Sequence, residues 1–69
     1  MIANKIEFDN TSAVLCARMV ALDKDTREQA AIDAEAVLTE LPKFLRNSPH
    51  CRNEIGAMRT LISRALAKK

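Results

Sequence analysis

The sequence predicts an all-α fold, and three observations support this. The chain is rich in Ala, Leu, Glu, Arg and Lys, which favour helices, and it holds one Gly, no Trp and no Tyr. Apolar residues recur at spacings of three and four over most of its length. Residues that can cap helices precede these apolar segments. Together they predict three helices over residues 11–22, 26–46 and 48–67, preceded by an extended arm over residues 1–10.

The predicted arm rests on a short alternating pattern. Ile6 and Phe8 flank a charged Glu7, as they would in a strand. The polar run from Asp9 to Ser12 can then accept hydrogen bonds from the free N–H groups of a helix that starts there. Because one strand is not stable alone, the arm would either pair with the same segment of a second copy or lie frayed on the helices.

The predicted first helix is apolar nearly all round, since Arg18 is the only charged residue between Ala13 and Leu22. Such a helix is buried centrally or shared between subunits, and a chain of 69 residues has little other material to cover it. We therefore expect a homodimer or higher assembly, as is common for chains this short. The residues expected to mediate self-association are Ile6, Phe8, Val14, Val20 and Leu22.

The second predicted helix, residues 26–46, carries an apolar stripe that continues past Pro42. Asp25 or Thr26 has the right spacing from Glu28 or Gln29 for a capping box at its start. Proline removes one N–H and clashes with the preceding turn, so we expect a kink or a helix restarted near Pro42.

The third predicted helix, residues 48–67, starts with Ser48 as its cap and Pro49 in its first turn. Its apolar stripe runs from Cys51 to Leu66 and matches the stripe of the second helix in length. Two equal stripes joined by a short turn predict a long antiparallel helical hairpin. We expect residues 1–69 to form a single small domain with its helical body over residues 11–67.

Cys16 and Cys51 are the only cysteines and lack CxxC spacing, and neither a signal-peptide pattern nor a long apolar run is present. These features predict a cytoplasmic protein with free thiols. A thiol at Cys51 next to His50, near a helix start, could be reactive, but Cys51 occupies an inward position of the stripe.

No residue spacing in the chain indicates a catalytic or metal site. A metal ion needs three or four ligands, and one chain offers Cys16, His50 and Cys51 with carboxylates at no recognisable spacing, although sharing across a dimer would raise the number of ligands. Asp33 and Glu35 point to different faces of a helix, as solvated charges do. We therefore expect no catalytic residues, no metal, no cofactor and no enzymatic activity.

The charge is uneven along the chain, because residues 47–69 hold five basic residues against Glu54 alone. A basic third helix after a turn superficially suggests a helix-turn-helix, and Gly56 between Arg52 and Arg59 would allow a nucleic-acid backbone to approach. The predicted helices are long for that motif, however, and cations near a helix C-terminus are favoured by the helix dipole without any ligand. The possible phosphate contacts are Arg52, Arg59, Arg64, Lys68 and Lys69.

The favoured functional hypothesis is a non-enzymatic module that regulates a larger protein partner, for example a small antirepressor or inhibitor. An apolar helix on a slender frame offers interface area out of proportion to its internal core. A nucleic-acid-binding regulator that uses the third helix is the alternative. The expected partner contacts are Val14, Leu15, Arg18, Met19, Arg52, Arg59 and Arg64.

Overall fold

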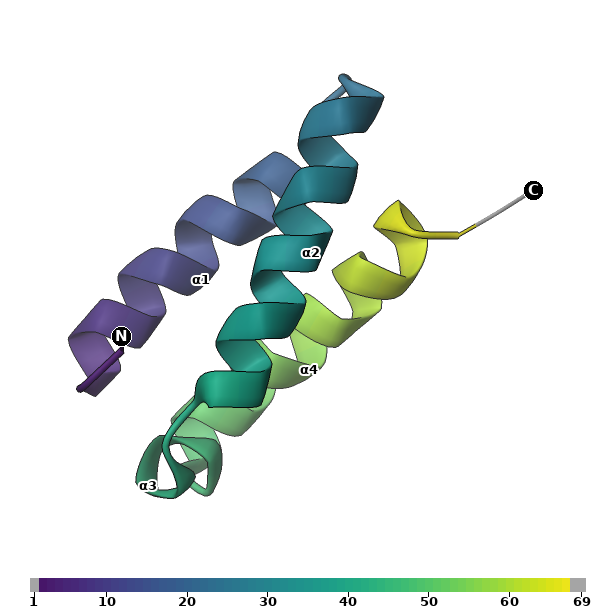
Figure 1. The fold of residues 1–69 in the computed structure, drawn as a ribbon. Coiled ribbons are helices and arrows are strands. Elements are labelled where there is room, and N and C mark those ends of the chain that lie inside the picture. Colours follow the sequence, from purple (N-terminus) through teal and green to yellow (C-terminus); the bar gives the residue numbers. More distant parts are fainter. Residues whose placement is uncertain (1, 68–69) are drawn as a thin grey trace.

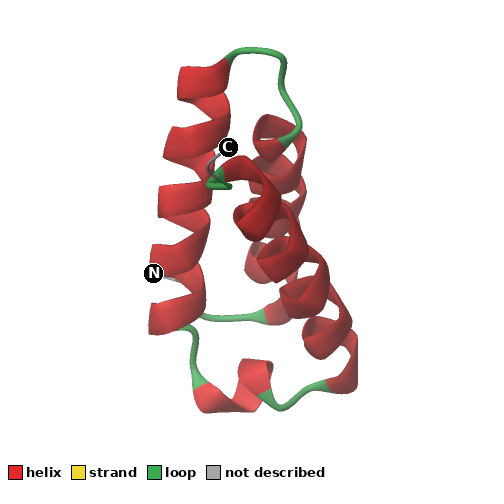
Figure 2. Cartoon of the chain, turned by 90° about the vertical axis from the view of Figure 1, so that its right-hand side faces the viewer, coloured by secondary structure: helices red, strands yellow, loops and turns green. Residues whose placement is uncertain are grey.

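The chain is all-helical, as predicted, in the computed structural model, which describes residues 2–67. Three long helices each pack against the other two, and a short helix contacts the last of them at one end of the molecule (Figure 1). The resulting body is elongated, with extents of 36 × 18 × 16 Å (Figure 2). The helices are α1 (Lys5–Met19), α2 (Lys24–Glu40), α3 (Lys43–Arg46) and α4 (Pro49–Ala65).

The extended arm predicted over residues 1–10 is wrong, because α1 already begins at Lys5. Asn4 caps this helix: its side chain accepts a hydrogen bond from the Glu7 N–H at 2.9 Å, while the Glu7 carboxylate accepts one from the Ala3 N–H at 2.7 Å. This reciprocal cap fixes the first turn four residues into the chain. The polar run from residue 9 to residue 12, which predicted a helix start, lies inside the helix.

The apparent strand pattern is also compatible with a helix. Residues two apart on a helix point about 200° apart, so a three-residue alternation fits a helix as well as a strand. Ile6 is 72% exposed and Phe8 is completely buried, which places them on opposite sides of α1. Residues 5–10 are therefore helical and need no pairing with the same segment of a second copy of the chain.

The turn between α1 and α2 is held by two side chains. Asp23 caps α2 by accepting hydrogen bonds from both the N–H and the hydroxyl of Thr26, at 2.8 and 2.7 Å. The Arg27 guanidinium donates to the carbonyls of Ala21 and Leu22, at 2.9 and 2.7 Å. The second helix therefore starts two residues before the predicted residue 26, with Asp23 as the cap in place of the predicted alternatives.

The single helix predicted over residues 26–46 is in fact two helices. Leu41 and Pro42 are extended, with ψ angles of 129° and 149°. The ring of Pro42 disfavours helical backbone at Leu41, the residue before it. The chain restarts as α3, so the expected restart near Pro42 is confirmed. The connection from α2 to α4 is consequently longer than the two- or three-residue turn of a simple hairpin, and Phe44 of α3 is 64% exposed.

The fourth helix matches its prediction closely. Ser48 precedes it, Pro49 stands in the first turn, and the helix ends at Ala65. Its inward side packs on α1 and α2 (Figure 1). The buried residues of this side are Cys51, Ile55, Met58 and Ile62.

The core lies between the three long helices. The fully buried residues of α2 are all alanines, and Val37 and Leu38 of the same helix pack partly buried against the core. The bulk comes from the other helices, above all from Phe8 and Met58, which are completely buried. The buried alanines of α2 are Ala30, Ala31 and Ala34.

Candidate functional site

The side of α1 that faces away from α2 and α4 is exposed and mostly apolar, with Asn10 as a polar residue among its apolar side chains. Its residues recur at spacings of seven, four and three, which places them along one side of the helix. Val14 next to them is 50% exposed and Val20 is 62% exposed. We call this surface the outer α1 face; its residues are Ile6, Ala13, Val14, Ala17 and Val20.

Leu22 extends this apolar surface into the following turn, where it is 98% exposed. Arg18 is also exposed, and it is the only charged residue between residues 10 and 22. An apolar side chain so fully exposed, two residues after the exposed Val20, favours a surface that another molecule covers.

Three residues predicted to mediate contacts lie inside the molecule instead. Phe8, expected to mediate self-association, is completely buried, and Leu15 and Met19, expected to contact a partner, are 6% and 3% exposed. They occur on the side of α1 that packs on α2 and α4, since a helix that is apolar all round must direct part of its residues to its own core. Their role in the folded chain is packing, which corrects that part of the prediction.

The predicted arginines of α4 are all exposed. Arg52 and Arg59, with Gly56 between them, line a hollow of about 260 Å³, and Arg46 of α3 lines it as well. A Cβ atom added at Gly56 would meet nothing within 4 Å, so the backbone is open to a ligand there. Arg64 lies exposed nearer the end of α4, and Lys68 and Lys69 fall outside the described residues.

Arg46 has a structural task that the sequence did not indicate. Its guanidinium donates to the carbonyls of Leu38 and Leu41, both at 3.2 Å, and to that of Thr39 at 3.4 Å. These carbonyls at the end of α2 lack partners within the helix, because no following turn supplies N–H groups. Arg46 thus caps α2 across the break at Pro42.

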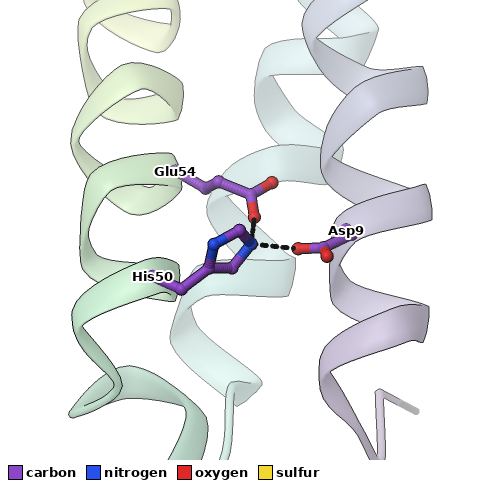
Figure 3. Close-up of side chains that lie close together, drawn as sticks. All are labelled: Asp9, His50 and Glu54. Carbon is purple, nitrogen blue, oxygen red and sulfur yellow. Dashed lines mark hydrogen bonds and ion pairs between the residues drawn. The ribbon is translucent and has the colours of Figure 1, made fainter.

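A cluster of three titratable side chains joins the N-terminal parts of α1 and α4 (Figure 3). The Nε2 atom of His50 lies 3.0 Å from Oδ1 of Asp9 and 2.9 Å from Oε2 of Glu54. His50 and Glu54 are four residues apart on α4 and share one side of it, while Asp9 comes from α1. The side chains are 48%, 39% and 26% exposed for His50, Asp9 and Glu54, so solvent reaches the cluster.

The two carboxyl groups differ in their acidity. A side-chain hydrogen bond with Glu54, and then one with His50, lower the pKa of Asp9 below its ordinary value. Burial, and then the nearby Asp9 carboxylate, raise the pKa of Glu54. As pH falls, Glu54 therefore takes up a proton before Asp9 does.

The sequence does not indicate this cluster. In the sequence His50 is adjacent to Cys51, but Cys51 is completely buried and belongs to the core, as its position in the apolar stripe indicates. The spacing of four between His50 and Glu54 is visible in the sequence. Asp9 could not be added to them, because it was assigned to the extended arm.

None of the helices within residues 2–67 is long and apolar enough to span a bilayer. Both cysteines are free. Comparisons with protein families, with curated proteins and with solved structures give no match for this chain.

Proposed function

We propose that the chain is a non-enzymatic, cytoplasmic protein-binding module that regulates a larger protein by docking on it, as a small antirepressor or inhibitor does. The single observation that supports this most is the exposure of Val14, Val20 and Leu22 on a surface that carries one charge. Leaving these side chains in water forgoes about 1.5–3 kcal/mol for each that a partner could bury.

The chemistry of the outer α1 face defines the partner surface that would fit it. Ala13 and Ala17 are the small exposed residues of this face, so the side chains of a partner helix could pack over them beside the exposed valines. Arg18 follows Val14 by four residues and lines a hollow with Asp25 and Asp33 of α2, so an acidic residue on the partner would pair with it only at the edge of the outer α1 face. We therefore propose an apolar partner stripe with a carboxylate at its edge.

The sequence assigns Val14 both to self-association and to partner binding, and one surface cannot be covered twice. We therefore propose that a second copy covers the outer α1 face when the partner is absent, and that the partner displaces it. The homodimer expected from the sequence would then be the resting form. Arg52, Arg59 and Arg64 on α4 stay exposed in either state and could add contacts to the larger partner.

The test compares two variants that carry the same substitution on different surfaces. Val20→Glu places a charge in the outer α1 face, and Ile32→Glu places one on α2. The two side chains are similarly exposed, Val20 at 62% and Ile32 at 53%. We expect Val20→Glu to weaken capture of the partner from the source organism by at least about tenfold, with helicity unchanged. Ile32→Glu should bind as the wild type does. Equal capture by both variants would contradict the proposal.

Light scattering on the same proteins tests the resting form separately. Wild type should have the mass of a dimer at micromolar concentration, and Val20→Glu that of a monomer. A monomeric wild type would contradict the dimer, while partner capture would still report on docking.

The hollow at Gly56 favours nucleic-acid binding as the second candidate function. Arg52 and Arg59 flank an open piece of backbone there, an arrangement that suits a phosphate group. If this function holds, binding to random-sequence duplex should weaken steeply with salt. Arg52→Ala and Arg59→Ala should each lower the slope of log K against log salt by about 1, and Arg18→Ala on α1 should not. Absence of binding at low salt would remove this candidate.

A further inference from the structure

We propose that Asp9, His50 and Glu54 form a binding site for a divalent transition-metal ion, Zn²⁺ in the first place, that links α1 to α4. One donor atom from each of the three side chains lies within 4.8 Å of the others. Figure 3 shows both carboxyl groups close to the same corner of the imidazole ring, with Nε2 directed to both. This site is independent of the outer α1 face.

The hydrogen bonds of the cluster are incomplete. The Nε2 atom of a neutral imidazole carries at most one proton, yet two carboxylate oxygens lie 2.9 and 3.0 Å from it. The bond to Asp9 has good geometry, whereas Oε2 of Glu54 is buried and receives no aligned hydrogen bond from residues 2–67. When both carboxyl groups are ionised, the single proton on Nε2 cannot serve both acceptors, but a cation placed between the three atoms can contact all of them.

The distances suit such an ion. Donor atoms bound to one metal ion at about 2.1 Å lie roughly 3.0–3.4 Å apart, depending on whether the geometry is octahedral or tetrahedral. The observed separations from Nε2 need to open by only a few tenths of an ångström. One imidazole with two carboxylates suits Zn²⁺ better than Mg²⁺, which prefers oxygen ligands alone.

Three protein ligands leave at least one coordination position for water, so the ion would exchange with solvent. The main consequence is structural, because the ligands come from two helices that are distant in sequence. An ion that binds only when α1 and α4 are packed together stabilises the folded chain. Chains of this length often need such an additional link.

The test is a Zn²⁺ titration of chelator-treated protein without a histidine tag, followed by calorimetry and by thermal unfolding. We expect one ion per chain and an increase in Tm of at least about 5 °C in excess Zn²⁺. Mg²⁺ at the same concentration should leave Tm unchanged. His50→Ala and Asp9→Asn should each bind Zn²⁺ at least about tenfold more weakly.

Matched variants distinguish this site from other groups of the chain that could bind the ion. Glu35→Gln removes an exposed carboxylate of α2 and should bind as the wild type does. His50→Gln keeps a polar side chain at an exposed position, so it shows binding loss without loss of fold if His50→Ala is unstable. Equal affinity in wild type and His50→Gln would overturn the proposal. A thiolate absorption band on loading with Co²⁺ would overturn it too, because it would assign the ion to Cys16 or Cys51.

Discussion

α1 and α4 are similar in length, at 15 and 17 residues, but they distribute their apolar side chains differently. In α4 the buried side is apolar and the opposite side carries arginines, so the contacts within the chain account for its whole pattern. In α1 apolar residues occur on both sides, and contacts within the chain account for only one of them. A second apolar side in a helix that already has a complete core side indicates a contact outside the chain.

The largest expected effect comes from the buried side of α1. Phe8→Ala removes a completely buried aromatic ring and should lower the free energy of unfolding by about 3–5 kcal/mol, which is enough to unfold much of a small domain. Ile6→Ala, on the exposed side, should change it by less than about 0.5 kcal/mol. Urea denaturation of dilute protein followed by circular dichroism measures both values. Equal effects would mean that the two sides of α1 do not differ.

The first turn of α1 should respond to loss of its cap. Asn4→Ala removes the acceptor for the Glu7 N–H and should lower the free energy of unfolding by about 1 kcal/mol. The same urea titration measures this change. A neutral result would indicate that the helix starts later in solution, as the predicted arm requires.

A stabilising change is expected in α4. Gly56 is in the middle of the helix and has free space around it, so Gly56→Ala should raise the free energy of unfolding by about 0.5–1 kcal/mol. Thermal unfolding should show a Tm several degrees higher. A lower Tm would mean that the surface of α4 at Gly56 is covered. Contacts within the chain would then not account for the whole of α4, and α4 would not differ from α1 in this respect.

The smallest effect concerns the turn after α1 and depends on pH. The hydroxyl and N–H of Thr26 hold the pKa of Asp23 below its ordinary value of 3.8. Because the pKa of Asp23 is lower in the folded chain than in the unfolded chain, its carboxylate stabilises the fold fully at pH values above the unfolded-state pKa. This stabilisation is lost as pH falls through the folded-state pKa. The difference in unfolding free energy between wild type and Asp23→Asn should therefore be constant near neutral pH and shrink below about pH 4. A difference that does not change with pH would contradict the cap.

The helices could be predicted from the sequence where two signals agree. α4 has both a Ser-Pro start and a regular apolar stripe, and its bounds differ from the prediction by one or two residues. The start of α1 was missed because Asn4 and Glu7 have the spacing of a cap but lie beside a short alternation that also fits a strand. Pro42 predicted a break correctly, while the direction of the chain after it depends on the packing of α3 against α4.

The candidate sites could be predicted only in part. The number of apolar residues in the first helix indicated an exposed surface, but which of them remain exposed depends on the orientation of α1 in the core. Val14 and Val20 are exposed while Leu15 and Met19 are buried, although all four belong to one apolar run. The position of Asp9 beside His50 depends on tertiary structure, since the two residues are 41 positions apart in the sequence.

The most direct test of the contact on the outer α1 face is photo-crosslinking in cells of the source organism. A photoreactive residue at Ala17 is placed in that face, and the same residue at Ala36 is placed on the exposed side of α2. We expect an adduct with a larger protein from position 17 that disappears in the Val20→Glu background, and none from position 36. Absence of any adduct at position 17, or equal adducts from both positions, would contradict a protein contact at this face.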